Sequence, residues 1–194
     1  MIEGDNGVFD DDEAALARYR AAEEKLRNTP PRCLDGFKIA PVELKDVAFD
    51  GHCSDLNKVY RLACGCGHDR FRVLGHFLKN DRGQAVFVSP LALECADCGT
   101  VTELIDTDQH GYDAELGHGS ATIRGNGVRT HYACETCGVR PMTAFARFEH
   151  SGEELADSFM EQFPNVQDCF SWFSLLGKCD GCRRMLNVAD FECA

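Results

Sequence analysis

Eight of the twelve cysteines form four close pairs, and thiols at this spacing are typical metal ligands. The pairs are Cys64 with Cys66, Cys95 with Cys98, Cys134 with Cys137, and Cys179 with Cys182. A tetrahedral zinc ion takes four thiolates at about 2.3 Å, which two such pairs supply. The four pairs therefore predict two zinc ions per chain. Both sites would be closed, so they would stabilise the fold without offering an open coordination position for catalysis.

Other uses of these thiols, and the way in which the pairs combine, are open at this point. Rubredoxin-type iron takes the same four thiolates, and disulfides are a further alternative. The single residue between Cys64 and Cys66 disfavours a bond within that pair. Sequential sharing of the metals, in which the first two pairs hold one ion and the last two the other, closes the shortest loops and is our expectation. Interleaved sharing is the alternative.

Four cysteines lie outside the pairs, namely Cys33, Cys53, Cys169 and Cys193. Free cysteine packs as a small apolar residue, so we expect these thiols to be buried. A third metal site that involves His52 and Cys53 is the alternative interpretation.

A second group of candidate ligands lies midway along the chain: Asp106, Asp108, His110, Asp113 and His118. Carboxylates and imidazoles of this kind can form a hydrolytic metal centre. Their spacing fits no established motif such as His-Glu-x-x-His, which favours a solvated connector instead. The sequence also lacks a phosphate-binding Walker loop, a dinucleotide-binding glycine pattern and a nucleophile elbow. We therefore expect a protein that is not an enzyme.

Short strands and tight turns must position the cysteine pairs, and the sequence arranges them as an internal repeat. The first copy begins at Tyr60 and the second at Tyr132. Each copy predicts a strand, a cysteine turn, a strand out, a strand back, a second cysteine turn and a last strand. The last strands are expected at residues 101–105 and 185–188.

The pattern Cys-x-x-Cys-Gly at Cys95–Gly99 and Cys134–Gly138 resembles the zinc-ribbon superfamily, whose metal sits between two such knuckles on β-hairpins. Glycine permits the left-handed backbone that follows the second cysteine. Two knuckles depart from the pattern, because Cys64–Gly67 is one residue short and Arg183 follows Cys182. The resemblance covers about residues 58–190, and it implies an architecture rather than a particular functional family.

The expected fold class is mainly β (α+β), with two zinc-ribbon-like antiparallel units, an N-terminal helix and a short helix inserted in the second unit. The N-terminal helix is expected over about residues 12–27, with an apolar stripe that packs on its own protein or on a partner. Residues 37–50 read as one bent strand or two short ones. The inserted helix follows the capping pattern that begins at Ser151. The expected division is an acidic leader (1–32), a first unit with its preceding extended segment (33–108), a connector (109–129) and a second unit (130–194).

Charge decides between the functions that this architecture allows. The formal net charge is -12 with neutral thiols, and two four-thiolate zinc sites would bring it to about -16. Such a protein attracts basic partners and repels phosphate backbones. We therefore expect a zinc-binding inhibitor, immunity-type protein or adaptor that recognises a basic protein. Nucleic-acid binding is the alternative, and a metal-dependent enzyme that uses His110–His118 comes third.

The expected setting is cytoplasmic, because the acidic N-terminus does not resemble a secretory signal and no apolar run is long enough to span a membrane. The expected contact regions are three acidic stretches, each of which can instead serve as a solubilising face. They are the leader (Asp10, Asp11, Asp12), the segment between the two copies of the repeat (Asp106, Asp108, Asp113, Glu115) and the inserted helix (Glu153, Glu154, Asp157, Glu161).

Overall fold

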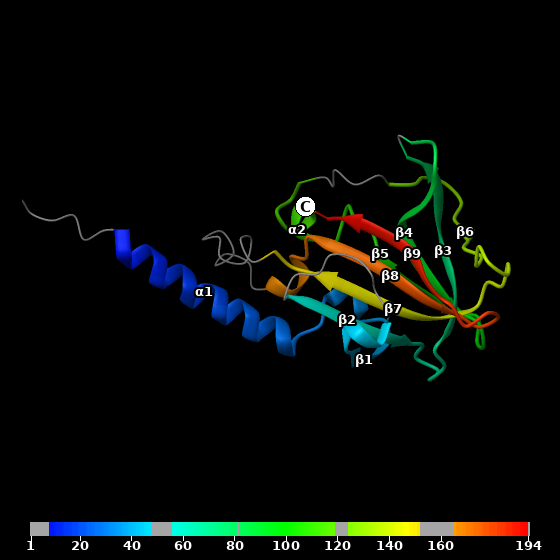
Figure 1. Cartoon of the computed structure of the whole chain (residues 1–194), viewed down its shortest axis with the longest axis horizontal. Coiled ribbons are helices and arrows are strands. Elements are labelled where there is room, and N and C mark those ends of the chain that lie inside the picture. The colour runs from blue at the N-terminus through cyan, green and yellow to red at the C-terminus, as the bar shows by residue number, and fades with distance from the viewer. Residues whose placement is uncertain (1–7, 48–55, 81, 119–123, 152–164, 194) are drawn as a thin grey trace, which may run out of the picture.

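In the part of the chain that the structure describes, an N-terminal helix is followed by a single curled antiparallel sheet of nine strands, which makes up the body of the protein (Figure 1). The computed structural model describes residues 8–47, 56–80, 82–118, 124–151 and 165–193. The predicted fold class, mainly β with an N-terminal helix, is confirmed. The inserted helix expected after Ser151 lies outside the described residues.

Helix α1 (Val8–Asn28) precedes all the strands, and three single-turn 3-10 helices and a short α2 lie between or beside them. The strands are β1 (Lys38–Val42), β2 (Asn57–Ala63), β3 (Arg70–Lys79), β4 (Ala85–Cys95), β5 (Val101–Ile105), β6 (Thr130–His131), β7 (Met142–Glu149), β8 (Trp172–Cys179) and β9 (Met185–Glu192). The short helices are η1 (Arg32–Leu34), η2 (Leu44–Val47), α2 (Tyr112–Glu115) and η4 (Val166–Asp168). The strand order is β1-β2-β7-β3-β4-β5, with β6 beside β3 and β8 between β7 and β9.

Each half of the chain, that is, each copy of the repeat, contributes a strand that pairs with the other half, and the two pairings have matching register. Strand β2, which leads into the first cysteine turn, pairs with β7 of the second half and places Arg61 opposite Phe145. Strand β6, which leads into the third cysteine turn, pairs with β3 of the first half and places His131 opposite Leu74. Arg61 and His131 each precede a pair's first cysteine by three residues, and Phe145 and Leu74 each follow a pair's second cysteine by eight. Both halves therefore depend on each other's backbone hydrogen bonds.

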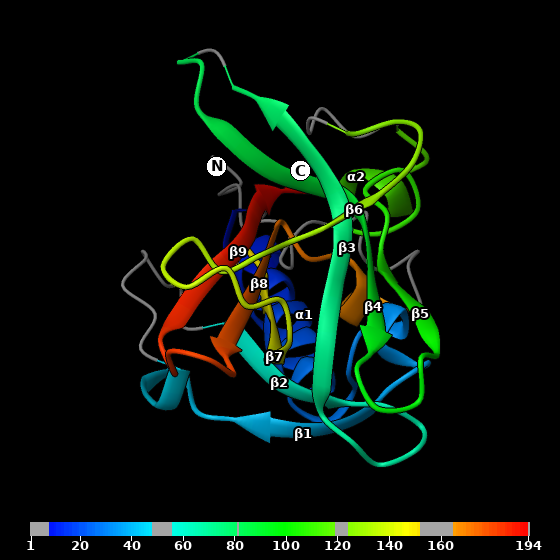
Figure 2. The ribbon, with the colours of Figure 1, turned by 90° about the vertical axis from the view of Figure 1, so that its right-hand side faces the viewer.

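The sheet folds over on itself, so its concave face forms the main core. Figure 2 shows β3 and β4 in front of β7, β8 and β9, and β4 lies next to β9. Large apolar side chains from both sides meet in between, including Phe71 and Leu93 from one side and Phe148, Phe173 and Phe191 from the other. The β-branched and aromatic residues that predicted the strands are therefore the residues that fill the core.

The prediction of extended backbone over residues 37–50 is correct for β1 and wrong for residues 44–47, which form η2. The amide of Asp46 donates to the Glu43 carbonyl, which closes the turn. This turn places Val47, which is fully buried, against Val59 and Phe145 on the outer face of the sheet. Burial of the apolar side chain thus outweighs the strand preference of the local sequence.

Helix α1 begins before and ends just after the predicted residues 12–27, and its C-terminal half packs on the body. Tyr19, Ala22 and Leu26 contact a small cluster that includes Leu56 and Val166. In Figure 1 the helix extends away from the sheet toward its N-terminus. Within the described residues, no helix combines the length and the apolar character that crossing a membrane requires.

Candidate metal centres

The structure gathers the eight paired cysteines into two groups of four sulfurs. One group is Cys64, Cys66, Cys95 and Cys98, and the other is Cys134, Cys137, Cys179 and Cys182. Within each group all sulfur atoms lie within 4.8 Å of one another. The pairs thus combine sequentially, as we expected.

The separations of the sulfurs fit a tetrahedral ion. Cys64 Sγ lies 3.6 Å from Cys98 Sγ, and Cys66 Sγ lies 3.7 Å from Cys95 Sγ. In the second group the corresponding distances are 3.7 Å for Cys134–Cys182 and 3.5 Å for Cys137–Cys179. Four sulfurs at about 2.3 Å from one zinc ion would be about 3.8 Å apart, whereas a disulfide needs about 2.05 Å. The described cysteines are all free thiols, so both groups suit a four-thiolate metal.

Each cysteine turn is fixed by the same two backbone hydrogen bonds. In three turns the first cysteine's amide donates to the carbonyl five residues ahead, and its carbonyl accepts from the amide four residues ahead. In the shorter turn at Cys64 the partners are the carbonyl of His68 and the amide of Gly67. The missing residue therefore tightens this turn without removing its sulfurs from the site.

In every cysteine turn, the residue after the second cysteine adopts a left-handed backbone conformation. Gly67, Gly99 and Gly138 have φ values of 96°, 75° and 73°. Arg183 takes the same position with φ 63°, and it is the one residue other than glycine with positive φ among those described. The departure from the glycine pattern thus changes the residue but keeps the backbone geometry.

Cationic and hydroxyl groups surround the first sulfur group and connect it to the second. Arg70 lies 3.8 Å from Asp97 in one cysteine turn and donates from Nε to Asp180 in another at 2.8 Å. The Thr100 hydroxyl, 3.3 Å from Cys98 Sγ, is the main cause that lowers the pKa of this thiol to about 6. A lowered pKa favours the thiolate that a metal needs. Sequence reasoning missed the bridging role of Arg70, because its two partners are far apart in the sequence.

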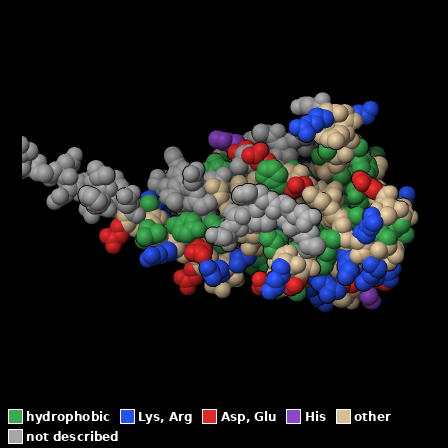
Figure 3. Space-filling model, viewed as in Figure 1, with side chains coloured by type: hydrophobic (Ala, Val, Ile, Leu, Met, Phe, Trp, Pro, Cys, Tyr) green, Lys and Arg blue, Asp and Glu red, His purple; other side chains and the backbone are tan. Residues whose placement is uncertain are grey.

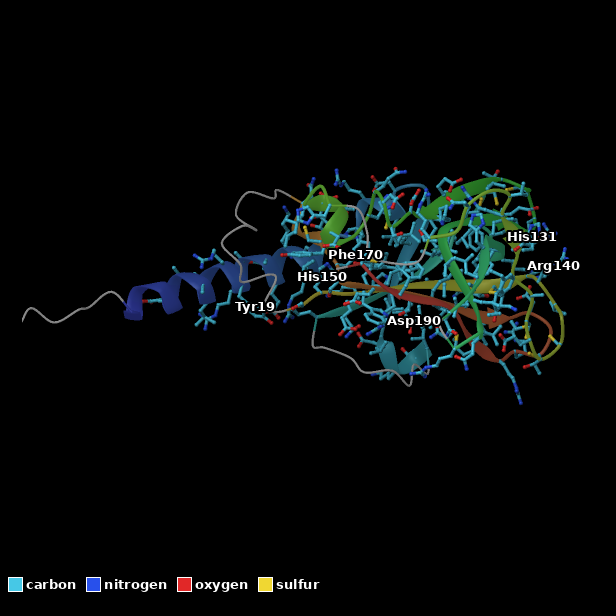
Figure 4. All side chains as sticks on the ribbon, turned by 90° about the horizontal axis from the view of Figure 1, so that it is seen from above. Tyr19, His131, Arg140, His150, Phe170 and Asp190 are labelled. Atoms are coloured by element: carbon cyan, nitrogen blue, oxygen red, sulfur yellow. The ribbon has the colours of Figure 1, made fainter. Side chains whose placement is uncertain are left out.

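Beside the second sulfur group, four cations lack an ion-pair partner within the described structure: Arg140, Lys178, Arg183 and Arg184. Figure 3 shows Lys and Arg side chains gathering at the end of the molecule opposite α1. Figure 4 places His131 and Arg140 at that end, far from Tyr19. A divalent ion bound by four thiolates would carry two negative charges, which these cations would offset.

The candidate residues of the connector do not form a third group of ligands. Arg124 donates two hydrogen bonds to the carboxylate of Asp106, at 2.8 and 2.7 Å, and its Nε lies 3.0 Å from Asp108. His110 Nδ1 accepts from the Asp106 amide at 3.0 Å. The amide of Asp113 donates to Cys193, and that of His118 donates to Asp113. Within the described ranges, the two cysteine groups are the sets able to hold a metal.

The unpaired cysteines that the structure describes, Cys33, Cys169 and Cys193, are buried as expected. Burial raises the pKa of Cys193 to about 12 and that of Cys33 further. These thiols therefore act as small apolar residues. Cys53, and with it the alternative site with His52, lies outside the described residues.

Comparisons with known proteins find no match: no family model fits the sequence, and neither a curated protein nor a solved structure is similar to it.

Proposed function

We propose that the protein is a two-zinc, non-catalytic binding module built from a duplicated zinc-ribbon-like unit, which acts as an inhibitor, immunity-type protein or adaptor for a basic protein. The observation that carries the zinc assignment is the spacing of 3.5–3.7 Å between sulfurs in both groups. Zinc suits this ligand set because closed four-thiolate sites are its common structural form. A reducing compartment such as the cytoplasm would keep the thiols available.

A binding function rather than catalysis is supported by how the polar groups are used. The two metal sites are closed, and Asp106 and Asp108 are engaged by Arg124. Glu115 pairs with Arg32 at 2.8 Å. These three connector acids therefore serve internal contacts, so we no longer favour the connector as the contact region.

The preference for a basic partner is supported by where the acidic residues lie. Fifteen Asp and Glu residues, but only 4 Lys and Arg, lie in residues 1–29, 48–55, 81 and 152–164. The remaining positions carry 17 Asp and Glu and 16 Lys and Arg. The acid excess thus belongs to the leader with α1 and to a few other segments, while the sheet is close to neutral before metal binding. We assign the long-range electrostatic attraction of the basic partner to the leader and the segment 152–164.

Metal content is the first test of this proposal. Native mass spectrometry with elemental analysis of the purified full chain should find two zinc ions per chain, released by acid or strong chelation. Absence of metal, iron in place of zinc, or disulfides across the cysteine pairs would overturn the zinc assignment.

Partner binding is the second test. The zinc-loaded chain should be used to purify partners from its native host, and each partner identified by mass spectrometry should then be produced separately. Calorimetry with the two purified proteins should give saturable binding that weakens with added salt. A retained protein that shows no binding in the purified system would count against the binding function.

One observation favours nucleic-acid binding as a second candidate. The four cations beside the second metal site have no ion-pair partner in the described structure, and each lies within three residues of a cysteine of that site in the sequence. Clustered Arg and Lys bind phosphate backbones. The negative total charge opposes this function. The two candidate functions can be distinguished, because removing acidic residues from the leader should weaken binding to a basic protein but should not weaken binding to nucleic acid.

A further inference from the structure

A hollow with aromatic walls lies where the β3–β4 hairpin, the start of the second half and β9 meet. Its volume is about 190 Å³. Phe77, Phe87, Tyr132, Glu135 and Asp190 are among its lining residues, with Ala85, Val86, Asn187, Val188 and Ala189. We refer to this set as the aromatic hollow. At about 30 Å³ per water molecule, it has room for about six waters, which is comparable to one long side chain.

Three rings in mutual contact form its apolar part. Phe77 lies 4.8 Å from Phe87 and 6.3 Å from Tyr132, measured between ring centroids, and the planes of Phe77 and Tyr132 are only 20° apart. Phe87 lies 5.3 Å from Tyr132 and is inclined to it by 65°. Phe87 and Tyr132 are buried, but Phe77 is 50% exposed. Phe77 therefore offers an exposed aromatic face that two buried rings hold in place.

Phe77 is exposed because of the shape of β3. The register between β3 and β4 shifts between Leu74 and His76, and Phe77 then lies opposite Phe87 in the hairpin that rises above the rest of the sheet (Figure 2). The ring therefore lies two residues before β3 ends at Lys79, near the tip of this hairpin, where a second protein can reach it.

The rim of the hollow is negatively charged. Glu135 is exposed and has no ion-pair partner among the described residues. Asp190 is also exposed, and its Oδ1 accepts hydrogen bonds from Trp172 Nε1 at 2.6 Å and from the Ser174 hydroxyl at 2.7 Å. No Lys or Arg is among the ten lining residues. Glu135 also lies between two zinc ligands of the second site, whose net charge would add to its own.

We propose that the aromatic hollow binds an arginine side chain of the partner protein. A guanidinium group is flat and weakly hydrated, so it stacks on an aromatic face and pairs with a carboxylate at the same time. Phe77 supplies the exposed aromatic face, which the buried rings of Phe87 and Tyr132 support, and Glu135 and Asp190 supply the carboxylates. A leucine side chain would form no ion pair with either carboxylate. This inference rests on the proposed recognition of a basic protein and names the side chain that is recognised.

The experiment uses the full zinc-loaded chain and three blocked tripeptides. Gly-Arg-Gly is the probe, Gly-citrulline-Gly has nearly the same shape without the charge, and Gly-Leu-Gly is apolar. Amide shifts in two-dimensional NMR should change around Phe77, Tyr132, Glu135 and Val188 with the arginine peptide. The citrulline and leucine peptides should give smaller changes at these positions.

Variants then locate the binding. Phe77→Leu, which keeps an apolar side chain, and Glu135→Gln should each raise the Kd for Gly-Arg-Gly about two- to fivefold. Val101→Ala changes an apolar residue with a similar exposure of 52%, and Glu43→Gln removes an exposed acid elsewhere, so both should leave the Kd unchanged. Every variant is first checked for two zinc ions.

The inference is overturned if the arginine peptide produces no shifts at the hollow, if citrulline matches it, or if Phe77→Leu and Glu135→Gln have no effect. Such a result, combined with partner binding that persists in Phe77→Leu, would leave the proposed function in place and reject only the hollow. If the native chain binds neither the arginine peptide nor a partner protein, both the hollow and the proposed function are rejected.

Discussion

A single backbone position shows how far a sequence pattern can be trusted at the scale of one residue. Glycine after the second cysteine was expected because only glycine adopts positive φ without strain. The structure keeps that conformation at Arg183, with φ 63°. The pattern therefore predicted the turn correctly, although a residue in it differs from the preferred one.

Replacing Arg183 by glycine should stabilise the protein. A left-handed conformation destabilises a residue other than glycine by about 1–2 kcal/mol. Glycine in turn lowers the stability by about 0.4–1 kcal/mol, because it increases the conformational entropy of the unfolded chain. The expected gain in the free energy of unfolding of zinc-loaded Arg183→Gly is about 0.5–1 kcal/mol. Denaturant unfolding at fixed zinc concentration measures it. Gly138→Ala is the matched control, because Gly138 has φ 73° and open space around it, and it should lose a similar amount.

His150 should make the stability depend on pH. It is 1% exposed, its Nε2 lies 3.3 Å from the Gln167 carbonyl, and its ring lies 6.3 Å from that of Phe170 (Figure 4). Burial, the main cause, lowers its pKa to about 4, and the charge of Lys58 acts in the same direction. The unfolded chain takes up this proton near pH 6.5, so stability is lost as the pH falls from about 6.5 to 4, by about 3 kcal/mol in all.

Comparison of the native chain with His150→Gln isolates this contribution. Loss of zinc at low pH affects both proteins, so it cancels in the difference, and zinc content is measured in parallel. The difference in free energy of unfolding should shrink or reverse as the pH falls from 7 to 5. His118→Gln removes an exposed histidine and should keep the native pH profile. Parallel pH profiles for His150→Gln and the native chain would contradict the assignment.

At the scale of elements, much of the strand sequence could be predicted, whereas the pairing could not. The last strand of the first half was expected at residues 101–105 and is β5, and the last strand of the second half begins at Met185 as expected. Alternating and β-branched residues carry this information locally. The exchange of β2 and β6 between the halves depends on contacts across more than 50 residues, and no spacing in the sequence reports it.

The strand exchange predicts that the two metal sites form and fail together. A loss of the first site in Cys98→Ser would release β3, on which β6 and the second site depend. Because structural zinc supplies on the order of 10 kcal/mol of folding energy, the zinc content should fall from two toward zero rather than to one. Elemental analysis of the soluble protein measures it, with Cys33→Ser expected to keep both ions.

Chelator titration of the native chain keeps this prediction testable if Cys98→Ser is insoluble. Native mass spectrometry during stepwise addition of chelator should show the two-zinc and metal-free forms with little of the one-zinc form. Accumulation of a folded one-zinc species would show that the halves are independent despite their shared sheet.

At the scale of the whole molecule, the sequence gives the total charge but not where it acts. The negative charge is unevenly distributed, because the positions outside residues 1–29, 48–55, 81 and 152–164 carry nearly balanced charges, with Arg140 and Arg184 exposed beside the second metal site. The aromatic hollow also could not be predicted from the sequence. Phe77, Tyr132 and Asp190 come from three distant segments, and only the exposure of Phe77 distinguishes it from the other strand phenylalanines.

The distribution of charge leads to a prediction that separates the two candidate functions. Changing Asp10, Asp11 and Asp12 to Asn removes three negative charges from the leader. If the leader attracts a basic protein, this triple variant should associate more slowly with the partner, and the difference should shrink with added salt. The same variant should bind nucleic acid no worse than the native chain, because a repulsion has been removed. Fluorescence anisotropy with a single-stranded DNA or RNA of about 20 nucleotides should give a Kd weaker than roughly micromolar at physiological salt for both proteins. Tighter binding that is abolished by Arg140→Gln with Arg184→Gln would instead make the cations beside the second metal site the functional surface.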